Sequence, residues 1–580
     1  MYLKSTVLSL MIVLSGIACT SNSSKDPENT LHLPVIEKIK GLDPIYAEDK
    51  YAGEEVGKAY EGLLQYHYLK RPYVLIPSLA ESMPVVSSDG KTYTFKIKKG
   101  VVFQDDPSFK ETNGKGRELT ADDFTYSFKR LADSKLTSNG WWIFEGKIVG
   151  LDEWRKTGGS DYSKTVEGLK SLDRYTLQIK LNQRSAQMLY LLTMPYASVV
   201  PHEAVDYYGK EFINHAVGTG PFRLLSFNGA SKIVWLKNPT YRREVYPSEG
   251  SPGDKEAGLL ADAGKPLPFA DKLVTHVHVE QQPMWLNFLA GKLDMTTLPK
   301  DNFSQAITAS KEISPELKAK GIYVSKVPGL DVTHESFNLA DPIIGKNKLL
   351  RHALSLAYNS EPLIDLFYNG RAIPAQGPIP PGLAGYDPDF KNPYRQFNLS
   401  KAKELLAKAG YPEGKGLPPI EYATQDGSTM RQFSDYLQKS FASIGVQLKV
   451  NTYSWPEFLS AVKQKRGQMW GWAWNGDYPD AENFLQLFYS KNLPPGQNDS
   501  YYESPEFDKL YEKALTLTDT PERTALYKEM VKILVEDCPW IFGVHRTHYG
   551  LANPWLKNYQ YNDMDHGRFK YFRLDTALKK

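Results

Sequence analysis

The pattern of apolar residues along the chain predicts a mixed α/β fold. Segments with the two-residue period of strands alternate with segments that have helical periodicity, and no internal repeat of fixed length occurs. Tyr93, Phe95 and Ile97 alternate with polar residues after the turn signal Ser88-Asp89-Gly90, which predicts a strand. At roughly 150 residues per domain, 580 residues allow about four domain-sized units.

Three helices are predicted from residues that favour helix starts. Thr120 is expected to cap one helix, with Asp123 at its third position. Ser400 is expected to open a second helix that Gly410 ends, and Thr520-Pro521 a third near the C-terminus. Residues 246–269 are rich in Gly and Pro, which predicts a long surface excursion.

The composition excludes several classes of protein. Lys and Arg number 70 against 67 Asp and Glu, so the net charge is only +3, and 41% of residues are hydrophobic. These values argue against disorder and against a nucleic-acid partner. Aromatic residues reach 12%, which suits binding surfaces as well as cores. Two cysteines exclude a disulfide scaffold and a multi-cysteine metal site.

The first residues have the layout of a secretory signal peptide. Lys4 precedes an apolar run over 5–17, and small residues follow at Ala18 and Cys19. As a helix this run would be about 20 Å long, short of the ~30 Å hydrocarbon core. We expect a signal peptide over 1–18 and a tether over 19–30, which places the protein in the periplasm or cell envelope.

Cys19 stands where a bacterial lipoprotein signal is cut, so it is the candidate lipidation site, although Gly16 occupies a position that is usually apolar. An ordinary cleaved signal is the alternative. If Cys19 is acylated, the protein would contact the membrane only through the lipid, and Cys538 would be a lone, buried thiol.

Familiar catalytic motifs are missing. The chain has no G-x-S-x-G elbow, no G-x-x-x-x-G-K-[ST] phosphate loop and no H-E-x-x-H zinc helix. His276 and His278 would share one strand face, but without a nominated third ligand we interpret them as a polar strand face rather than a metal site. We expect no enzyme activity, no metal and no cofactor.

The segment from Trp470 to Tyr478 carries the most information about function. It reads Trp-Gly-Trp-Ala-Trp-Asn-Gly-Asp-Tyr, so in an extended chain three tryptophans share one face and Gly471, Ala473 and Asn475 the other. The nearly bare face would allow a backbone or ligand to approach closely, and Asp477 follows where the strand ends. A core strand beneath a tryptophan cluster, with a capping aspartate, explains the pattern as well.

Ordered motifs over more than 500 residues give the chain a family resemblance. It resembles the extracellular solute-binding proteins of ABC importers, family 5, and among them the oligopeptide- and dipeptide-binding proteins. The pieces that carry the resemblance include Leu42-Asp43-Pro44, Tyr60-Glu61-Gly62-Leu63, Pro77 to Ser82, Leu119 to Phe124, Val217 to Phe222, Ala290 to Met295, Phe337-Asn338, Arg351 to Leu354, Pro374 to Gly377, Ala402 to Tyr411, Asp477-Tyr478 and Ser504 to Asp508.

The resemblance implies a two-lobed, periplasmic-binding-protein-like fold in which the chain crosses between lobes twice. Lobe I would comprise 31–324 and 545–580, with an inserted subdomain near 61–188, and lobe II would comprise 325–544. It also implies a monomer that holds an oligopeptide between the lobes by strand addition and delivers it to the membrane permease of an ABC importer.

The resemblance also implies roles for individual residues. Asp477 would bind the α-ammonium group of the peptide. Trp474 would match the aromatic residue that the family has three positions before this aspartate. Ala473 to Asn475 would pair with the peptide main chain. In lobe I, the extended segment around Glu48 and Lys50 would offer further main-chain partners.

One position departs from the family pattern and widens the range of ligands. Gly471 stands where members that hold short peptides tightly have a basic residue for the ligand carboxylate. Longer or blocked peptides, or non-peptide solutes such as a nickel chelate, haem, an opine or an oligosaccharide, are therefore alternatives. An exported hydrolase and a peptide-sensing receptor are further alternatives.

Overall fold

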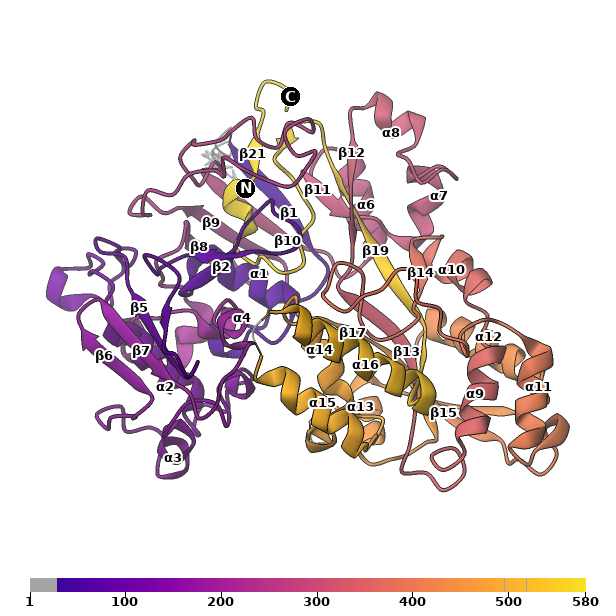
Figure 1. Ribbon diagram of the computed structural model, residues 1–580. Coiled ribbons are helices and arrows are strands. Elements are labelled where there is room, and N and C mark those ends of the chain that lie inside the picture. Colours follow the sequence, from indigo (N-terminus) through magenta and orange to yellow (C-terminus); the bar gives the residue numbers. More distant parts are fainter. Residues whose placement is uncertain (1–28, 495, 518, 580) are drawn as a thin grey trace, which may run out of the picture.

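The computed structural model describes residues 29–494, 496–517 and 519–579, which form two lobes joined by long strands (Figure 1). The mixed α/β fold predicted from the sequence is confirmed. The predicted signal peptide, Cys19 and the tether up to residue 28 lie outside the described residues. None of the helices described is both long and apolar enough to cross a membrane.

Lobe I is built on two four-stranded sheets that share one core. The first sheet has the order β1-β10-β9-β8, in which β1 runs parallel to β10 and the other pairs are antiparallel. The second has the antiparallel order β4-β5-β7-β6 and lies within the predicted subdomain. Leu31 of β1 and Phe95 of β5 belong to the same apolar cluster. The subdomain is therefore packed continuously with the rest of lobe I.

The bounds of the lobe I elements are as follows. The strands are β1 Thr30–Val35, β2 Leu64–Tyr66, β3 Leu75–Pro77, β4 Val85–Val86, β5 Thr92–Lys96, β6 Leu169–Asp173, β7 Thr176–Lys180, β8 Phe222–Asn228, β9 Lys232–Lys237, β10 Lys272–Val277, β20 Leu556–Lys557 and β21 Arg573–Leu574. The helices are α1 Lys50–Ala59, α2 Ala121–Ala132, α3 Leu151–Lys156, α4 Met188–Leu191, α5 His202–Tyr208, α6 Gln281–Leu289, α7 Phe303–Ala306 and α8 Pro315–Ala319.

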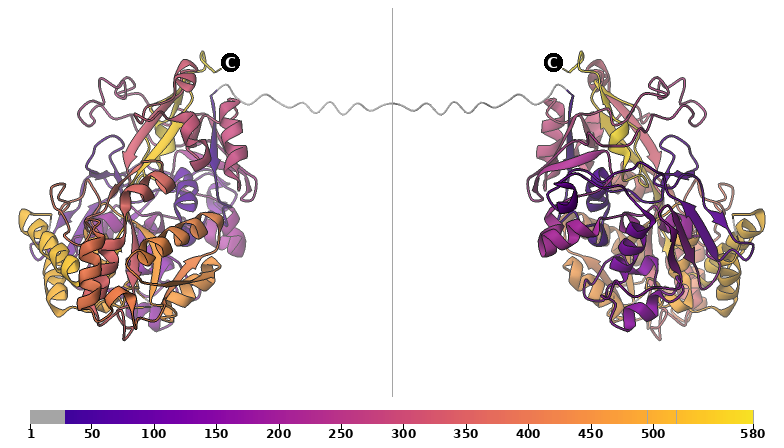
Figure 2. Two further views of the ribbon diagram at one scale, coloured as in Figure 1. Left: turned by 90° about the vertical axis from the view of Figure 1, so that its right-hand side faces the viewer. Right: turned by 90° about the vertical axis from the view of Figure 1, so that its left-hand side faces the viewer.

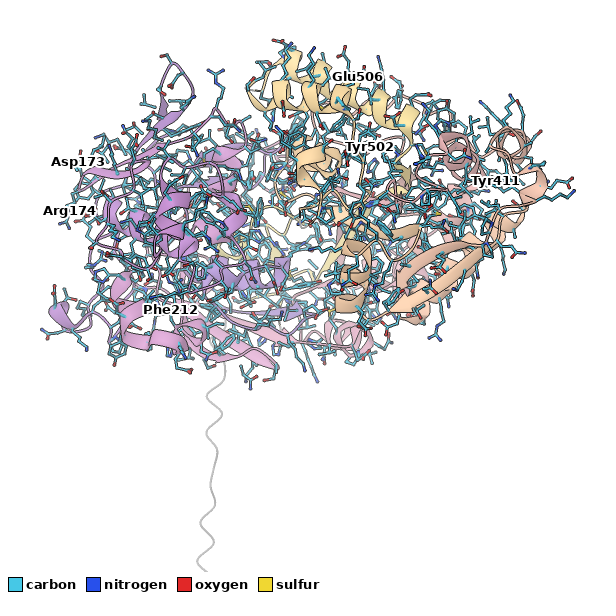
Figure 3. All side chains as sticks on the ribbon, turned by 90° about the horizontal axis from the view of Figure 1, so that it is seen from below. Asp173, Arg174, Phe212, Tyr411, Tyr502 and Glu506 are labelled. Atoms are coloured by element: carbon cyan, nitrogen blue, oxygen red, sulfur yellow. The ribbon has the colours of Figure 1, made fainter. Side chains whose placement is uncertain are left out.

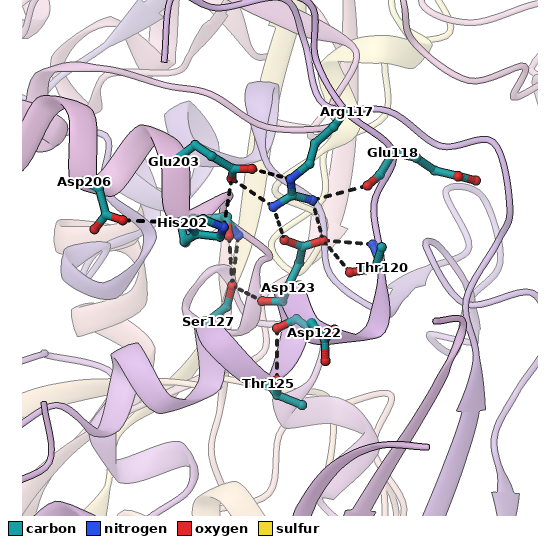
Figure 4. Close-up of polar contacts among 11 residues, drawn as sticks. Arg117, Glu118, Thr120, Asp122, Asp123, Thr125, Ser127, His202, Glu203 and Asp206 are labelled. Atoms are coloured by element: carbon teal, nitrogen blue, oxygen red, sulfur yellow. Dashed lines mark hydrogen bonds and ion pairs between the residues drawn. The ribbon is translucent and has the colours of Figure 1, made fainter. Parts of the chain in front are cut away.

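Helix α2 begins with the predicted cap. The Thr120 N–H and hydroxyl both donate to Asp123 Oδ2, which completes a capping box. The same carboxylate accepts two hydrogen bonds from Arg117, whose guanidinium also reaches Glu203 on α5 (Figure 4). One arginine thus ties the starts of α2 and α5 together.

Lobe II is a five-stranded sheet with helices on both faces. The strand order is β16-β15-β17-β13-β18, with β15 parallel to β16 and β17, and β13 antiparallel to both its neighbours. Helices α9 to α12 pack on one face, whereas α14 to α16 pack on the other (Figure 1). The elements are β13 Asp331–Phe337, β15 Ile420–Gln425, β16 Leu448–Tyr453, β17 Met469–Asn475, β18 Trp540–Phe542, α9 Lys348–Ala357, α10 Ser360–Tyr368, α11 Leu399–Lys408, α12 Ser428–Ala442, α13 Trp455–Lys463, α14 Glu482–Leu485, α15 Pro505–Leu515 and α16 Pro521–Asp537.

The chain passes between the lobes through a fourth sheet. Its order is β11-β19-β12, with β14 pairing to the other end of β19, and the strands are β11 Met295–Thr297, β12 Tyr323–Pro328, β14 Ala372–Pro374 and β19 Val544–Ala552. Gly329 follows β12, and a Cβ there would lie 2.6 Å from the His548 ring, so a larger residue would have to displace His548. The boundaries expected at 324/325 and 544/545 fall inside β12 and β19 and stay a prediction.

Other views separate the two lobes. The left view of Figure 2 has the orange helices of lobe II in front, and the right view has the indigo and purple elements of lobe I in front. From below, Asp173, Arg174 and Phe212 lie on one side of the molecule, and Tyr411, Tyr502 and Glu506 on the other (Figure 3).

Most of the local predictions are confirmed, with one correction. Thr520 caps α16 by accepting from the Arg523 N–H, and Cys538 is buried. Residues 246–269 contain turns and one isolated bridge residue instead of regular elements. Ser400 does not open its helix: α11 begins two residues earlier because the Asn398 side chain accepts from the Lys401 N–H. Asparagine is an equally good cap, and the periodicity could not distinguish the two starts.

Candidate ligand-binding site

Strand β17 has two different faces, as the alternation of its residues predicts. Trp470 is buried against Phe458 of α13, and Trp472 lies against the same helix, with ring centroids 5.7 Å apart for Trp472 and Phe458. Trp474 packs against the cluster formed by α14 to α16. The opposite face carries Met469 at the start of the strand and then only the small or short side chains of Gly471, Ala473 and Asn475.

One edge of β17 is left without a partner strand. Register with β15 extends only over Met469 and Trp470, whereas β13 pairs with β17 along its whole length. The Gly476 N–H donates to Leu330 O, the residue just before β13. In an antiparallel ladder every second residue is hydrogen-bonded to the partner strand, so the N–H and C=O groups of Trp474 and Trp472 also face β13. The N–H and C=O groups of Ala473 and Asn475 face the opposite edge of β17. Within the described part of the chain no strand occupies that edge.

Asp477 lies at the end of this edge and is held by a single side chain. Asn483 donates from Nδ2 to Asp477 Oδ2 at 2.9 Å, while its Oδ1 accepts from the Asp477 N–H at 3.0 Å and from Trp474 Nε1 at 2.9 Å. Burial raises the pKa of Asp477 to about 6, although the hydrogen bond from Asn483 opposes the shift. No cation among the described residues neutralises this carboxylate. The arrangement leaves it ready to accept a positive group.

Tyr196 brings lobe I up to this carboxylate. It belongs to the 3-10 turn Pro195–Ala197, and its pKa is raised by burial and by the nearby charges of Asp477, Glu48 and Asp49. Tyr190 of α4 also stacks on Tyr478, with ring centroids 6.0 Å apart and planes 6° from parallel. Asp477 therefore lies where the two lobes meet.

Around Glu48 and Lys50 the structure has a short segment between two helices, and Lys50 belongs to the second of them instead of to an extended segment. Residues 44–46 form a 3-10 turn and Lys50 begins α1, because the Asp43 and Asp49 side chains accept from backbone N–H groups that follow them. Glu48 pairs with Lys40 at 2.9 Å. Lys50 Nζ reaches Asp563 at 2.7 Å and the Tyr561 hydroxyl at 2.9 Å.

Lys50 and Asn475 belong to one polar network at the crossing strands. Arg546 on β19 donates to Asp331 at 2.7 Å and to Asn475 Oδ1 at 3.2 Å. His548 lies 3.6 Å from Asp331 and 3.8 Å from Asp563, which in turn pairs with Lys50. The predicted residues of both lobes are thus linked through the hinge strands.

The histidines that could have suggested a metal show no such site. His276 Nε2 lies 3.0 Å from His32 Nδ1, and His278 contacts Asn287. In the part of the chain that is described, no group of three or more potential ligand side chains could hold a metal ion.

Residues 74–494 match the bacterial extracellular solute-binding proteins, family 5. The chain belongs to this family. A dipeptide-binding protein of Escherichia coli is 28% identical over 516 residues, 86% of each chain. Heme-binding protein A of Haemophilus influenzae is 25% identical, over 86% of this chain and 84% of its own.

Solved structures agree with the fold of this family 5 protein. The periplasmic binding protein DppA of Helicobacter pylori, in complex with the peptide STSA, has a TM-score of 0.72 and 27% identity, covering 94% of this chain and 98% of its own. HbpA2 of Haemophilus parasuis has a TM-score of 0.74 at 23% identity, covering 94% and 100%. The two-lobed fold implied by the resemblance is confirmed.

Sequence reasoning nominated the β17 residues but missed the residues that position them. Asn483 is six positions after Asp477 (483 − 477), and only the turn into α14 brings it back. Tyr196 comes from the other lobe and is separated from Asp477 by nearly half of the chain. In the sequence, only the polar residue Asn483, a few positions after Asp477, could have indicated such a partner.

Proposed function

We propose that this family 5 protein captures peptides with a free N-terminus between its lobes and delivers them to the membrane permease of an ABC importer. In this proposal the peptide lies along the unpaired edge of β17, and its α-ammonium group meets Asp477. Trp474 and Tyr196 would cover the peptide's N-terminal residue from the two lobes. Glu48 and Lys50 remain predicted contacts from lobe I.

The observation that carries the proposal is the combination of an open strand edge with an unneutralised carboxylate at its end. A peptide main chain satisfies the edge, and its ammonium group satisfies Asp477, so neither contact depends on the peptide sequence. The carboxylate is already held by Asn483 and need not be ordered on binding.

Magnitudes indicate that both contacts are needed. Four or five main-chain hydrogen bonds at about 1 kcal/mol each supply roughly 5 kcal/mol. Association itself costs an estimated 4–15 kcal/mol, and micromolar affinity requires about 8 kcal/mol net. The charged anchor and burial under aromatic rings must supply the difference.

The remaining parts of the proposal concern location and assembly. The protein would act without catalysis, as a monomer, in the periplasm or cell envelope. Cleavage before Cys19 and acylation of its thiol would attach it to a membrane, and mass spectrometry of the mature N-terminus tests this.

The anchor is tested by Asp477→Ala with a peptide and its N-acetylated form, using titration calorimetry. We expect the variant to bind the free-amine peptide at least tenfold more weakly and the acetylated peptide with nearly unchanged affinity. Asp435→Ala, at an exposed aspartate on α12, is the control and should match wild type. Equal losses for both peptides would show that Asp477 is not the anchor.

A non-peptide solute is the second candidate, because Heme-binding protein A is among the relatives that match over most of the chain. Native mass spectrometry of the purified protein separates the two. A co-purified peptide supports the proposal, whereas a haem or metal-chelate mass would replace it.

A further inference from the structure

A buried glutamate lies over the bare position of β17. Glu335 on β13 is the register partner of Gly471, and a Cβ placed on Gly471 would overlap both Glu335 Oε2 and the Tyr422 hydroxyl. Glycine at 471 is therefore what leaves room for this carboxyl group. Gly471 itself is half-buried, and it adjoins the unpaired edge described above.

Glu335 has little to compensate its burial. It is 3% exposed, and the Tyr422 hydroxyl donates to Oε2 at 2.8 Å. Burial raises the pKa of Glu335 to about 8, with Tyr422 opposing the shift. The charge of Glu335 also contributes to the raised pKa values of Tyr358, after α9, and Tyr368, at the end of α10, so both tyrosines lie in its neighbourhood. No ion pair within the described residues includes Glu335.

Such a carboxyl group is costly to keep. A buried carboxyl group without a cation is costly when it is ionised, and protonation removes the charge but still leaves a buried polar group where an apolar residue of the same size would carry no such cost. Its neighbours Phe337 and Met469 on the same sheet face are apolar. The position is therefore better explained by an interaction made when ligand is bound than by stability.

The location relative to the edge identifies which part of a ligand would reach it. At about 3.4 Å per residue, Gly471 lies roughly 14 Å along β17 from Asn475. A peptide anchored at Asp477 would pass Gly471 with a residue well beyond its first. Its side chains alternate between the two sheet faces, and one on the Gly471 face would point toward Glu335 and Tyr422.

We propose that Glu335 is a specificity-determining residue that accepts the basic side chain, lysine or arginine, of the peptide residue beside Gly471. The inference rests on the peptide-binding function proposed above. The lysine or arginine side chain would supply the positive charge that the Glu335 carboxylate lacks, whereas an acidic side chain would be repelled by a group of the same charge. When the cation binds, Glu335 loses its proton to solvent and the pair is neutral.

The test uses alanine-based peptides in which positions two to five carry, one at a time, lysine or its uncharged analogue norleucine. In wild type we expect one position at which lysine binds at least tenfold more tightly than norleucine. At that position the lysine peptide should release close to one more proton at pH 7, measured by calorimetry in buffers of different ionisation enthalpy. Both readouts require only the wild-type protein.

Glu335→Gln then assigns the preference. We expect the lysine preference to fall below threefold while norleucine peptides keep their wild-type affinity, which also shows that the variant is folded. Tyr422→Phe retains the carboxyl group and should retain the preference. A preference that persists in Glu335→Gln, or equal affinities for lysine and norleucine at every position in wild type, would overturn the inference and leave peptide binding intact. Failure of every peptide to bind wild type would overturn the proposed function itself.

Discussion

At the scale of single residues, Asp477 depends on Asn483 for both its position and its availability. The amide of Asn483 uses its oxygen on the Asp477 N–H and on Trp474, so its NH₂ group is oriented to donate to the carboxylate. The carboxylate keeps a raised pKa because one hydrogen bond does not offset burial. A peptide ammonium group would supply the missing charge.

This raised pKa predicts that binding of free-amine peptides depends on pH. Asp477 must be ionised to bind the ammonium group, and below about pH 6 it becomes protonated in the empty protein. We expect Kd to increase about tenfold between pH 7 and pH 5, as one titrating group requires. The peptide amine, with a pKa near 8, stays protonated over this range.

The matching stability effect has the opposite sign. An acid whose pKa is raised in the folded state stabilises that state through its bound proton, and this stabilisation is lost as pH rises through about 4 to 6.

The predicted pH dependence of peptide binding is measured by calorimetric titrations at steps of half a pH unit, with the N-acetylated peptide as control. The same pH dependence for the acetylated peptide would show that a different group titrates.

At the scale of secondary-structure elements, β17 differs from an ordinary core strand because its two neighbours end at different places. β13 accompanies it to Asn475, but β15 turns away after Ala423 and continues beside β16. The main chain of Ala473 and Asn475 is left as an edge inside the protein instead of at its outer rim. Edges of this kind pair with extended peptides.

Pairing at this edge predicts an alternating response to N-methylation of the peptide. Methylation removes one N–H donor, so methylating an amide that faces β17 should weaken peptide binding by roughly 1 kcal/mol, a factor of about five in affinity. Amides between them point away from β17, so methylating them should cost affinity only where the lobe I segment around Glu48 and Lys50 pairs with the peptide. Competition binding with a series of singly methylated peptides measures this, and a peptide whose affinity is unchanged by methylation at every position would exclude strand addition.

At the scale of the whole molecule, the two lobes are connected by strands that carry a buried ion network. Asp331 is 1% exposed in its side chain and is bound by Arg546, with His548 nearby. His548 also faces Asp563, where Lys50 helps to lower the pKa to about 2 against the effect of burial. Charges from both lobes therefore meet at the crossing.

Removing Arg546 is expected to destabilise the protein strongly. Arg546→Met would leave Asp331 buried without its main partner, which costs about 3 kcal/mol of the free energy of unfolding. Urea denaturation measures the loss. Lys408→Met, which removes an exposed pair with Glu404 on α11, is the control and should cost less than about 0.5 kcal/mol. Similar losses for the two variants would show that the hinge network contributes no more than a surface pair.

Local sequence patterns were sufficient for much of the fold. The alternation around Phe95 and the caps at Thr120 and Thr520 are confirmed because strand periodicity and capping involve residues only a few positions apart. The helix start predicted at Ser400 was wrong, because Asn398, two residues earlier, is an equally good cap and is the one whose side chain accepts from the Lys401 N–H. The two-lobed arrangement came from the order of family motifs, not from periodicity.

The sequence by itself determined that Gly471, Ala473 and Asn475 share a nearly bare strand face that leads to Asp477. Only the tertiary structure decided what surrounds that face. It brings Asn483 back onto Asp477, Tyr196 across from lobe I, and Glu335 over Gly471. These contacts join residues whose meeting depends on turns, on strand register and on lobe packing, and no spacing along the chain encodes such long-range geometry.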